Sequence, residues 1–584
     1  RAAPPQYRSR GRRTMSQSGS YGTSQGAPAI KGSLQRPSVD EPSTSVAPPE
    51  KKEAEGHAHG HGHAGHELEW MGSGGLCHKP RLVVDWKSSD QFAAAERNQE
   101  LGDERHVSWA ELFFDLIYVT AIARLGENLR GDDDLVAIPF RDYIAMFMSI
   151  YTLWVLTAQY ATRFFNDDLF HKCWLGCMQL GVVMLAVHVR GGLAGPSGPI
   201  YCYTLAVLIA VLTVPYIPVT VYIEKYRGWT KLNFFQMALL VACAVIGGSS
   251  LVKPEDRWIW VICFSMVMPL HLVLIVFKRQ GLFPVDLPRP PPLDLEHYVE
   301  RVGLFMIIVL GETINGISLS VMEYPPAFYL AAFFGFLATF SQKLLYFDVD
   351  PKGLDEHAAR VDARRGIFWA FVHIALFAVT ALVGSGIAMI CALEGGAGDG
   401  YEHPEYARLY MSQGFGVMLM LLSLVRVAHL PPGNHLPDQF GKPVRTLAYV
   451  ADAIQVLCGG FLIALPQLWT EKQVDNVVIV GLCAGISTVN AIFNIAVRMR
   501  ASEAERLTDE WEARQDKPDG DDAGAPPKPR VRRHSEYRHA TMDAVHVTMT
   551  SRRGSMDAMA ADADGAGQSL LPAVRERRAV THHQ

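Results

Sequence analysis

Between residues 106 and 500 the sequence is a succession of apolar runs, each roughly 20 residues long. An α-helix rises about 1.5 Å per residue, so a run of this length crosses the roughly 30 Å hydrocarbon core of a bilayer. Lipid offers the backbone no hydrogen-bonding partner, and a helix satisfies its own backbone groups. The pattern therefore predicts an all-α polytopic membrane protein.

About twelve spans fit this pattern, and a proline-rich linker divides them into six and six. Proline lacks a backbone N–H and clashes with the preceding helical turn, so the run PRPPP separates two halves. The spans are expected at about residues 109–129, 141–163, 173–191, 200–222, 232–252, 258–277, 298–320, 326–347, 367–391, 406–427, 445–466 and 476–497.

The chain accordingly divides into five segments. These are a polar N-terminal tail (1–105), a first six-helix half (106–279), the linker (280–297), a second six-helix half (298–499) and a C-terminal tail (500–584). Both tails are rich in Arg, Ser, Pro and Gly and contain few apolar runs, which predicts that they are disordered.

Lysine and arginine are distributed unevenly among the short loops. Loops after even-numbered spans carry about 16 of these residues, and loops after odd-numbered spans carry about 7. Positive charge collects on the cytosolic side of membrane proteins, so the even loops and both termini are expected in the cytosol. The sequence does not indicate which membrane holds the protein.

The two halves share features that indicate an internal repeat. Matched residues recur in the same order and at similar offsets of 185, 183 and 195 residues. These pairs are Glu127 with Glu312, Gln159 with Gln342, and Trp174 with Trp369. Because each half has an even number of spans, the repeats would be parallel and related by an axis along the membrane normal, an arrangement found in transporters.

Two long motifs resemble those of the low temperature requirement A (LtrA) family. HVSWAELFFDLIYVTAIARL at 106–125 is similar to the family's opening signature, and DLEHYVERVGLFMIIVLGETI at 294–314 is similar to a second one. LLYFD at 344–348 and the span with His373 fit the same pattern. The resemblance implies a multi-pass membrane protein without a defined molecular activity. The long tails are typical of a eukaryotic, fungal type of elaboration on a bacterial core.

The first span carries an unusual number of charges. Glu111 and Asp115 lie four residues apart on one helix face, and Arg124 and Glu127 follow further along. A charge at the bilayer centre costs about 2.5–3.5 kcal/mol on insertion scales, so it normally faces the bundle interior and has a partner. We expect either a polar stripe that binds a proton or cation, or anchoring near the cytosolic end with Arg124 and Glu127 paired for packing.

The second half contains further polar candidates. Glu312 is the deepest carboxylate without an evident cationic partner, between Gly311 and Gly316, and it is either a transport residue or a neutral group that holds helices together. A lone histidine on an apolar helix is more often a packing residue than a ligand. The other candidates are His297 at the end of the linker and, in the second half, Glu300, Arg301, Asn315, Asp348 and His373.

Motifs in the two tails point to weaker possibilities. The tract GHAHGHGHAGH holds five histidines that would bind Zn, Ni or Cu loosely, namely His57, His59, His61, His63 and His66. No span contains the His-x3-Asp pair of zinc transporters, so a zinc transporter is not favoured. RRHS and RRGS make Ser535 and Ser555 candidate phosphorylation sites for a basophilic protein kinase.

Taken together, these features favour a secondary transporter, with proton coupling allowed by the buried carboxylates. The alternatives are a membrane sensor that signals through its tails and, with less support, an intramembrane lipid-modifying enzyme. The expected partners are membrane lipids and an unidentified small solute or proton. No cofactor is indicated: the chain has no GxxxxGK[ST] loop, and its net charge of −5 does not suggest a nucleic-acid partner.

Overall fold

A computed structural model describes residues 79–80, 82, 108–131, 137–164, 168–279, 288–319, 325–348, 357–397, 405–468 and 475–515. All of them belong to one compact unit, His66–Gln584. The histidine tract, Ser535 and Ser555 lie outside the described residues, so their predicted roles stay predictions. Within the described part there is no β-strand, and a single isolated bridge joins Leu82 to Phe164.

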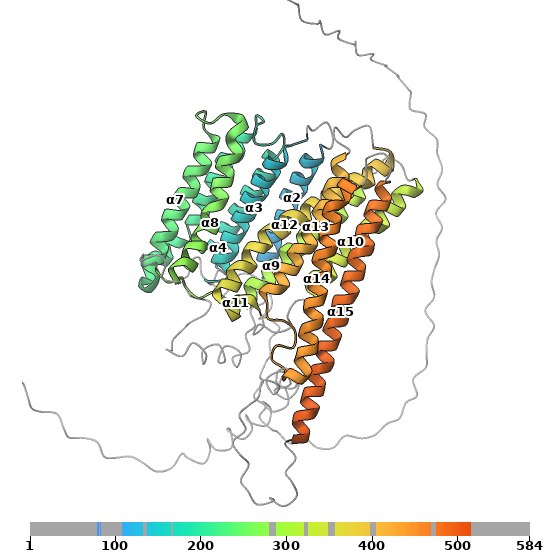
Figure 1. The fold of residues 1–584 in the computed structure, drawn as a ribbon. Coiled ribbons are helices and arrows are strands. Elements are labelled where there is room, and N and C mark those ends of the chain that lie inside the picture. Colours follow the sequence, from blue (N-terminus) through green and yellow to red (C-terminus); the bar gives the residue numbers. More distant parts are fainter. Residues whose placement is uncertain are drawn as a thin grey trace, which may run out of the picture. The chain divides into compact units, whose positions relative to one another are not determined.

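The described chain is built from helices, shown in Figure 1. The first half contains α2 (Trp109–Arg130), α3 (Phe140–Ala161), α4 (Leu169–His188), α5 (Gly198–Thr213), α6 (Tyr216–Tyr222), α7 (Arg227–Gly248) and α8 (Arg257–Arg279). The second half contains α9 (Leu295–Leu319), α10 (Pro326–Phe347), α11 (Ala358–Val361), α12 (Ala363–Ala392), α13 (Glu405–Ala428), α14 (Asp438–Leu468) and α15 (Asn476–Gln515). The all-α class is confirmed.

Eleven described segments are long and apolar enough to cross a membrane, with α5 and α6 forming one of them. The remaining predicted span, the first one at 109–129, corresponds to α2, which has 22 residues but is not among the eleven. Helix α2 is not among the eleven because it carries too many charges for an apolar span. These are Glu111, Asp115, Arg124, Glu127 and Arg130. Helix α2 nevertheless packs against α3, α4, α9 and α12. It is therefore an integral part of the bundle.

The two halves pack their helices in the same order. In the first half α2 contacts α4, α4 contacts α5, α5 contacts α7, α7 contacts α8, α8 contacts α3, and α3 contacts α2. In the second half α9, α12, α13, α14, α15 and α10 form the corresponding closed series. Six matching neighbour pairs support the six-helix repeat that the sequence predicts.

The contact between the halves is formed mainly by α2, α9 and α12. Helix α12 has 30 residues and is the most deeply buried of the candidate spans. It packs against α2, α3 and α8 of the first half as well as against α9 and α13. The buried aromatic side chains of Trp154, Phe305 and Phe377 lie at this contact.

Helix α15 continues beyond the predicted tail boundary at residue 499 and ends at Gln515. Its last turns pack on the start of α14, where Ala501 and Ala504 contact Leu436 and Val444. Figure 1 shows the two helices side by side over this length. The sequence after residue 500 is polar and has no apolar run, so it did not predict a helix. Two small residues at i, i+3 are nevertheless enough to form the packing face of α15 here.

Candidate functional site

The start of α2 fixes the position of the first carboxylate. Ser108 is the N-cap, and its Oγ accepts a hydrogen bond from the backbone N–H of Glu111 at 3.3 Å. The Glu111 side chain in turn accepts from the backbone N–H of Ser108 at 3.0 Å. This capping box holds Glu111 at the helix N-terminus, where a negative charge is also favoured by the helix dipole.

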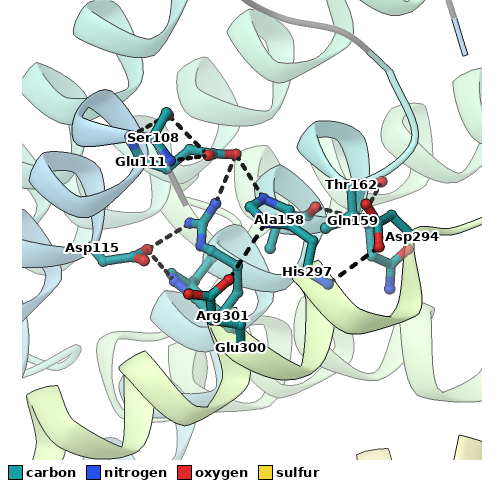
Figure 2. Close-up of polar contacts among 11 residues, drawn as sticks. Ser108, Glu111, Asp115, Ala158, Gln159, Thr162, Asp294, His297, Glu300 and Arg301 are labelled. Carbon is teal, nitrogen blue, oxygen red and sulfur yellow. Dashed lines mark hydrogen bonds and ion pairs between the residues drawn. The ribbon is translucent and has the colours of Figure 1, made fainter. Parts of the chain in front are cut away.

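Four charged or titratable side chains meet where α2 packs against α9, as Figure 2 shows. Arg301 lies between the two acids, with Nη1 3.3 Å from Glu111 Oε1 and Nη2 2.6 Å from Asp115 Oδ1. His297 Nε2 is 3.3 Å from Glu111 Oε1, and Trp154 Nε1 donates to Asp115 Oδ1 at 2.8 Å. All five residues are buried. We call Glu111, Asp115, His297 and Arg301 the α2–α9 charge cluster.

The charge cluster joins equivalent positions of two parallel helices. Glu111 and His297 are each the third residue of their helix, and Asp115 and Arg301 are each the seventh. Both pairs are separated by 186 residues. The first residues of α2 and α9, Trp109 and Leu295, have the same separation. Equivalent turns of α2 and α9 therefore lie beside each other where the two repeats meet.

Several atoms of the cluster are buried without a hydrogen-bond partner among the described residues. These are Asp115 Oδ2, Arg301 Nε and His297 Nδ1. Nδ1 of His297 lies 3.9 Å from a carboxylate oxygen of Glu300, whose side chain is 45% exposed. Buried ion pairs stabilise a fold only when their remaining polar atoms are also satisfied. The cluster therefore contributes less to stability than a fully satisfied ion-pair network of the same size would.

An aromatic layer follows the charge cluster along α9. The Phe305 ring lies 4.6 Å from Trp154, 5.4 Å from Tyr151 and 5.0 Å from Phe377, measured between ring centroids. The Arg301 guanidinium is 5.9 Å from the Trp154 ring centroid, within the range of a cation–π contact. Trp154 therefore contacts both the cluster and the layer.

Glu312 lies on α9 beyond the aromatic layer, about 16 Å along the helix axis from Arg301. Its side chain is 7% exposed. Its Oε2 atom is buried and accepts no hydrogen bond from any residue that the structure describes. Glu312 is thus a second buried carboxylate at the opposite end of the same helix from the charge cluster. Asn315, one turn further, is exposed.

Three other candidates form exposed ion pairs instead. Arg124 Nη1 lies 2.6 Å from Glu127 Oε2, with the side chains 60% and 26% exposed. This is the packing pair that the sequence analysis gave as its alternative for the two residues. Asp348 pairs with Lys343 at 3.1 Å, and both are exposed. None of these three acids or bases joins the α2–α9 charge cluster.

His373 is a buried packing residue in a ring cluster. Its Nδ1 donates to the backbone oxygen of Trp369 at 2.8 Å, and its Nε2 accepts from the Tyr346 hydroxyl at 3.0 Å. This pattern assigns the neutral tautomer with the proton on Nδ1. The ring is 4.2 Å from that of Trp369. The first half has a similar contact, in which Tyr160 bonds His171 at 2.8 Å.

Several buried polar contacts were not predicted from the sequence. In α4, Asp168 accepts from the His171 backbone and ring nitrogens at 2.8 and 2.6 Å, and the Asp-x-x-His spacing of a helix N-cap was the available signal. Between α13, α14 and α15, Arg426 bonds Asp452 at 2.7 Å and Gln455 at 2.8 Å. Arg426 also donates to Asn494. Its position at a span end made it resemble a loop cation.

No group of three or more His, Cys, Asp or Glu side chains in the described ranges is placed to hold a metal ion.

Residues 106–486 match the family model described as bacterial low temperature requirement A protein (LtrA). The chain belongs to the LtrA family. No curated protein and no solved structure gave a significant match. All four residues of the charge cluster lie within the part of this LtrA chain that the family model covers.

The charge cluster predicts strong energetic coupling between α2 and α9. Arg301→Gln should cost about 3–5 kcal/mol of unfolding free energy, because it leaves Glu111 and Asp115 buried without their cation. Asp115→Asn should cost less, because Arg301 keeps its contact with Glu111. The double variant should cost clearly less than the sum of the two. Thermal or denaturant unfolding of the purified protein in detergent measures this. Arg124→Gln, which breaks an exposed pair on the same helix, should cost less than about 1 kcal/mol.

If the effects of Asp115→Asn and Arg301→Gln instead add, the two side chains do not act as a pair.

The loop histidines His357 and His429 predict a loss of stability in acid. Burial lowers the pKa of His357 to about 4, and burial with nearby positive groups lowers the pKa of His429 to about 3. An unfolded chain protonates histidine near pH 6.5, so unfolding takes up protons between about pH 6.5 and 4. The melting temperature should therefore fall across this window. His357→Gln should flatten that slope, and an unchanged slope would contradict the assignment.

Proposed function

We propose that this LtrA protein is a secondary transporter whose pathway follows the α2–α9 contact, with proton coupling through its buried carboxylates. One observation carries the proposal. The incompletely satisfied charge cluster lies on one side of an aromatic layer, and the buried Glu312 lies on the other side. Ionisable side chains inside membrane segments are rare, and they mark ion and substrate pathways and proton relays.

The chemistry of the cluster suits proton exchange. Arg301 is shared between two carboxylates, so a proton on Asp115 would leave the guanidinium paired with Glu111 alone. A carboxyl group buried beside one shared cation changes its protonation state with small movements of that cation. Protonation of Asp115 would also weaken the bond that Trp154 Nε1 donates to it.

Trp154 links this protonation to the closure of the pathway. Its indole bonds Asp115 at 2.8 Å and packs against Phe305 at 4.6 Å. Phe305 in turn contacts Phe377 of α12, so the closed layer spans both halves of the protein. A change in charge at Asp115 would thus loosen the aromatic layer that separates the cluster from Glu312.

The repeat architecture provides the movement that a transporter needs. Two six-helix rings with the same neighbour order meet at α2, α9 and α12. Transporters built from related halves change access by rocking one half against the other around a site at their contact. The charge cluster lies at that contact, where such a movement would make and break the bonds of Arg301.

Proton flux into liposomes that contain the purified protein tests this proposal. With a pH gradient and the membrane potential clamped, wild type should acidify the lumen faster than empty liposomes. Glu312→Gln and Asp115→Asn should each lower the flux by at least about tenfold, because neither amide can carry a proton. Arg500→Gln is the matched control and should leave the flux unchanged, since its pair with Glu503 on α15 is exposed.

If wild type carries no flux with any ion gradient, or if Glu312→Gln is as fast as wild type, the transporter proposal fails. Each variant should first elute as a single species, so that loss of flux is not loss of folding. Removal of residues 516–584 tests the sensor alternative. This cut leaves α15 intact, whereas a cut at residue 501 would remove Ala501 and Ala504 from their packing on α14. A transporter keeps its flux without the tail.

A further inference from the structure

Two exposed cysteines lie one turn apart near the start of α4. Of the cysteines that the structure describes, three are exposed, namely Cys173, Cys177 and Cys263. Cys173 is the fifth residue of α4, and Cys177 is the ninth. Residues four apart on an α-helix lie on the same face, so the two thiols point away from the bundle side by side.

The two thiols belong to a longer exposed stripe of α4. Leu180, Met184 and Val187 continue this stripe along the helix, and they are 62%, 42% and 59% exposed. The opposite face of α4 packs against α2 and α5. Helix α4 is long and apolar enough to cross a membrane, so an apolar stripe on its outer face contacts the acyl chains of lipids.

The pair lies at the end of α4 that borders water. Asp168 caps this end by accepting a hydrogen bond from the backbone N–H of His171 at 2.8 Å, and Lys172 directly precedes Cys173. At 1.5 Å per residue, Cys173 and Cys177 are about 6 and 12 Å along the axis from the first residue of the helix. The distribution of lysine and arginine predicts that this end faces the cytosol. Both thiols are therefore juxtamembrane.

The surface between the two thiols is open. Gly176 lies on the same face, and a Cβ atom added to it would meet no atom of another helix within 4 Å. A Cβ atom added to Gly181, on the inner side of α4, would instead collide with the Leu208 side chain of α5. A modifying enzyme and the group that it attaches both need such open space, and the reactivity of a cysteine depends on the exposure of its thiol.

We propose that Cys173 and Cys177 are S-acylation sites, each of which takes a long-chain fatty acyl group as a thioester. The deprotonated Sγ atom attacks the carbonyl carbon of a long-chain acyl-CoA. A bond from Sγ to this carbon forms while the bond from the carbon to the CoA sulfur breaks, and CoA leaves as a thiol with the proton that the cysteine released. Juxtamembrane cysteines are typical acceptors of reversible S-palmitoylation.

The attached chain would enter the hydrocarbon along the outer stripe of α4, past Leu180 and Met184. Burial of its methylene groups there is favourable, because the stripe already contacts lipid. This modification is separate from transport: it stands or falls whether or not the protein moves a solute.

A contact with a second copy of the chain is the other use that small residues on a membrane helix suggest. Such contacts are rich in small residues, which let two helix backbones approach closely. On α4 the small residues occupy only the stretch from Cys173 to Cys177. Large exposed side chains come before and after it on the same face, beginning with Leu169 and Leu180, and they would hold a partner helix away from the thiols.

Acyl exchange on the full-length protein from a eukaryotic host cell tests the proposal. Free thiols are blocked in denaturant, hydroxylamine cleaves the thioesters, and a maleimide mass tag labels the thiols that are released. Wild type should gain tags that depend on hydroxylamine. Cys173→Ser and Cys177→Ser should each carry fewer tags than wild type, and the double variant should lose the tags of both sites.

The matched control is Cys263→Ser, which removes an exposed thiol near the start of α8. That end is predicted to face away from the cytosol, where acyl-CoA is absent, so this variant should keep the wild-type tags. Cys77 lies outside the described residues and is present in every variant, so a tag on it does not affect the comparison. Intact-protein mass spectrometry should show that the double variant has lost the mass of the fatty acyl groups.

Oxidative crosslinking in native membranes tests the contact with a second copy. A disulfide-linked dimer through Cys173, without acyl exchange at either cysteine, would assign this face to a second copy and overturn the proposal. The proposal is also wrong if the double variant carries as many tags as wild type, if wild type carries none, or if Cys263→Ser loses as many as the double variant. Both cysteines are exposed, so the serine variants should keep the wild-type melting temperature.

Discussion

The contact of Arg301 with two buried carboxylates is the interaction on which the rest of this structure depends. Helix α2 carries five charged residues and is too polar to be a membrane span by composition. Two of these charges, Glu111 and Asp115, are buried against α9, and the resulting attraction in a medium of low dielectric offsets part of the cost of removing them from water. The first helix of the bundle is therefore stable only when the seventh long helix lies beside it.

This dependence shapes the whole architecture. The partners are 186 residues apart, so α2 reaches its final environment only after the entire first half and the linker have been made. Contacts at such a sequence separation carry a large loop-closure cost and form late. Once formed, they place α2 and α9 together at the meeting point of the two rings, with α12 packed against both. The same interaction thus joins the two halves of the bundle.

The sequence was sufficient to predict the all-α membrane fold, eleven of the twelve spans and all four residues of the charge cluster. Glu111 and Asp115 were named from one motif, and His297 and Arg301 from another. What it could not provide was their pairing, because the charges on one helix do not indicate which of eleven others it faces. The offset of 185 residues between Glu127 and Glu312 is one less than the 186 residues that separate the paired residues of the cluster. It therefore indicated α9 as the partner of α2.

Other residues were missed for local physical reasons. Trp154 is an aromatic residue on an apolar helix, and only its contact with Asp115 distinguishes it from a packing residue. Arg426 looks like a loop cation until Asp452 and Gln455 are placed beside it. Ala501 and Ala504 belong to a polar stretch, yet small residues at i, i+3 let α15 continue against α14. In each case the decisive information was the neighbouring helix.

The register of the two repeats explains how related helices can attract each other. If the two halves are aligned on Glu127 and Glu312, an offset of 185 residues, Asp115 matches Glu300. Both are acids, and they would repel each other if both were buried. The structure pairs Asp115 with the next residue, Arg301, while Glu300 turns outward and is 45% exposed. One residue is about 100° around a helix, so this single step replaces a repulsion by an ion pair. The charge cluster therefore pairs unlike residues, acid with base, at equivalent positions of the two helices.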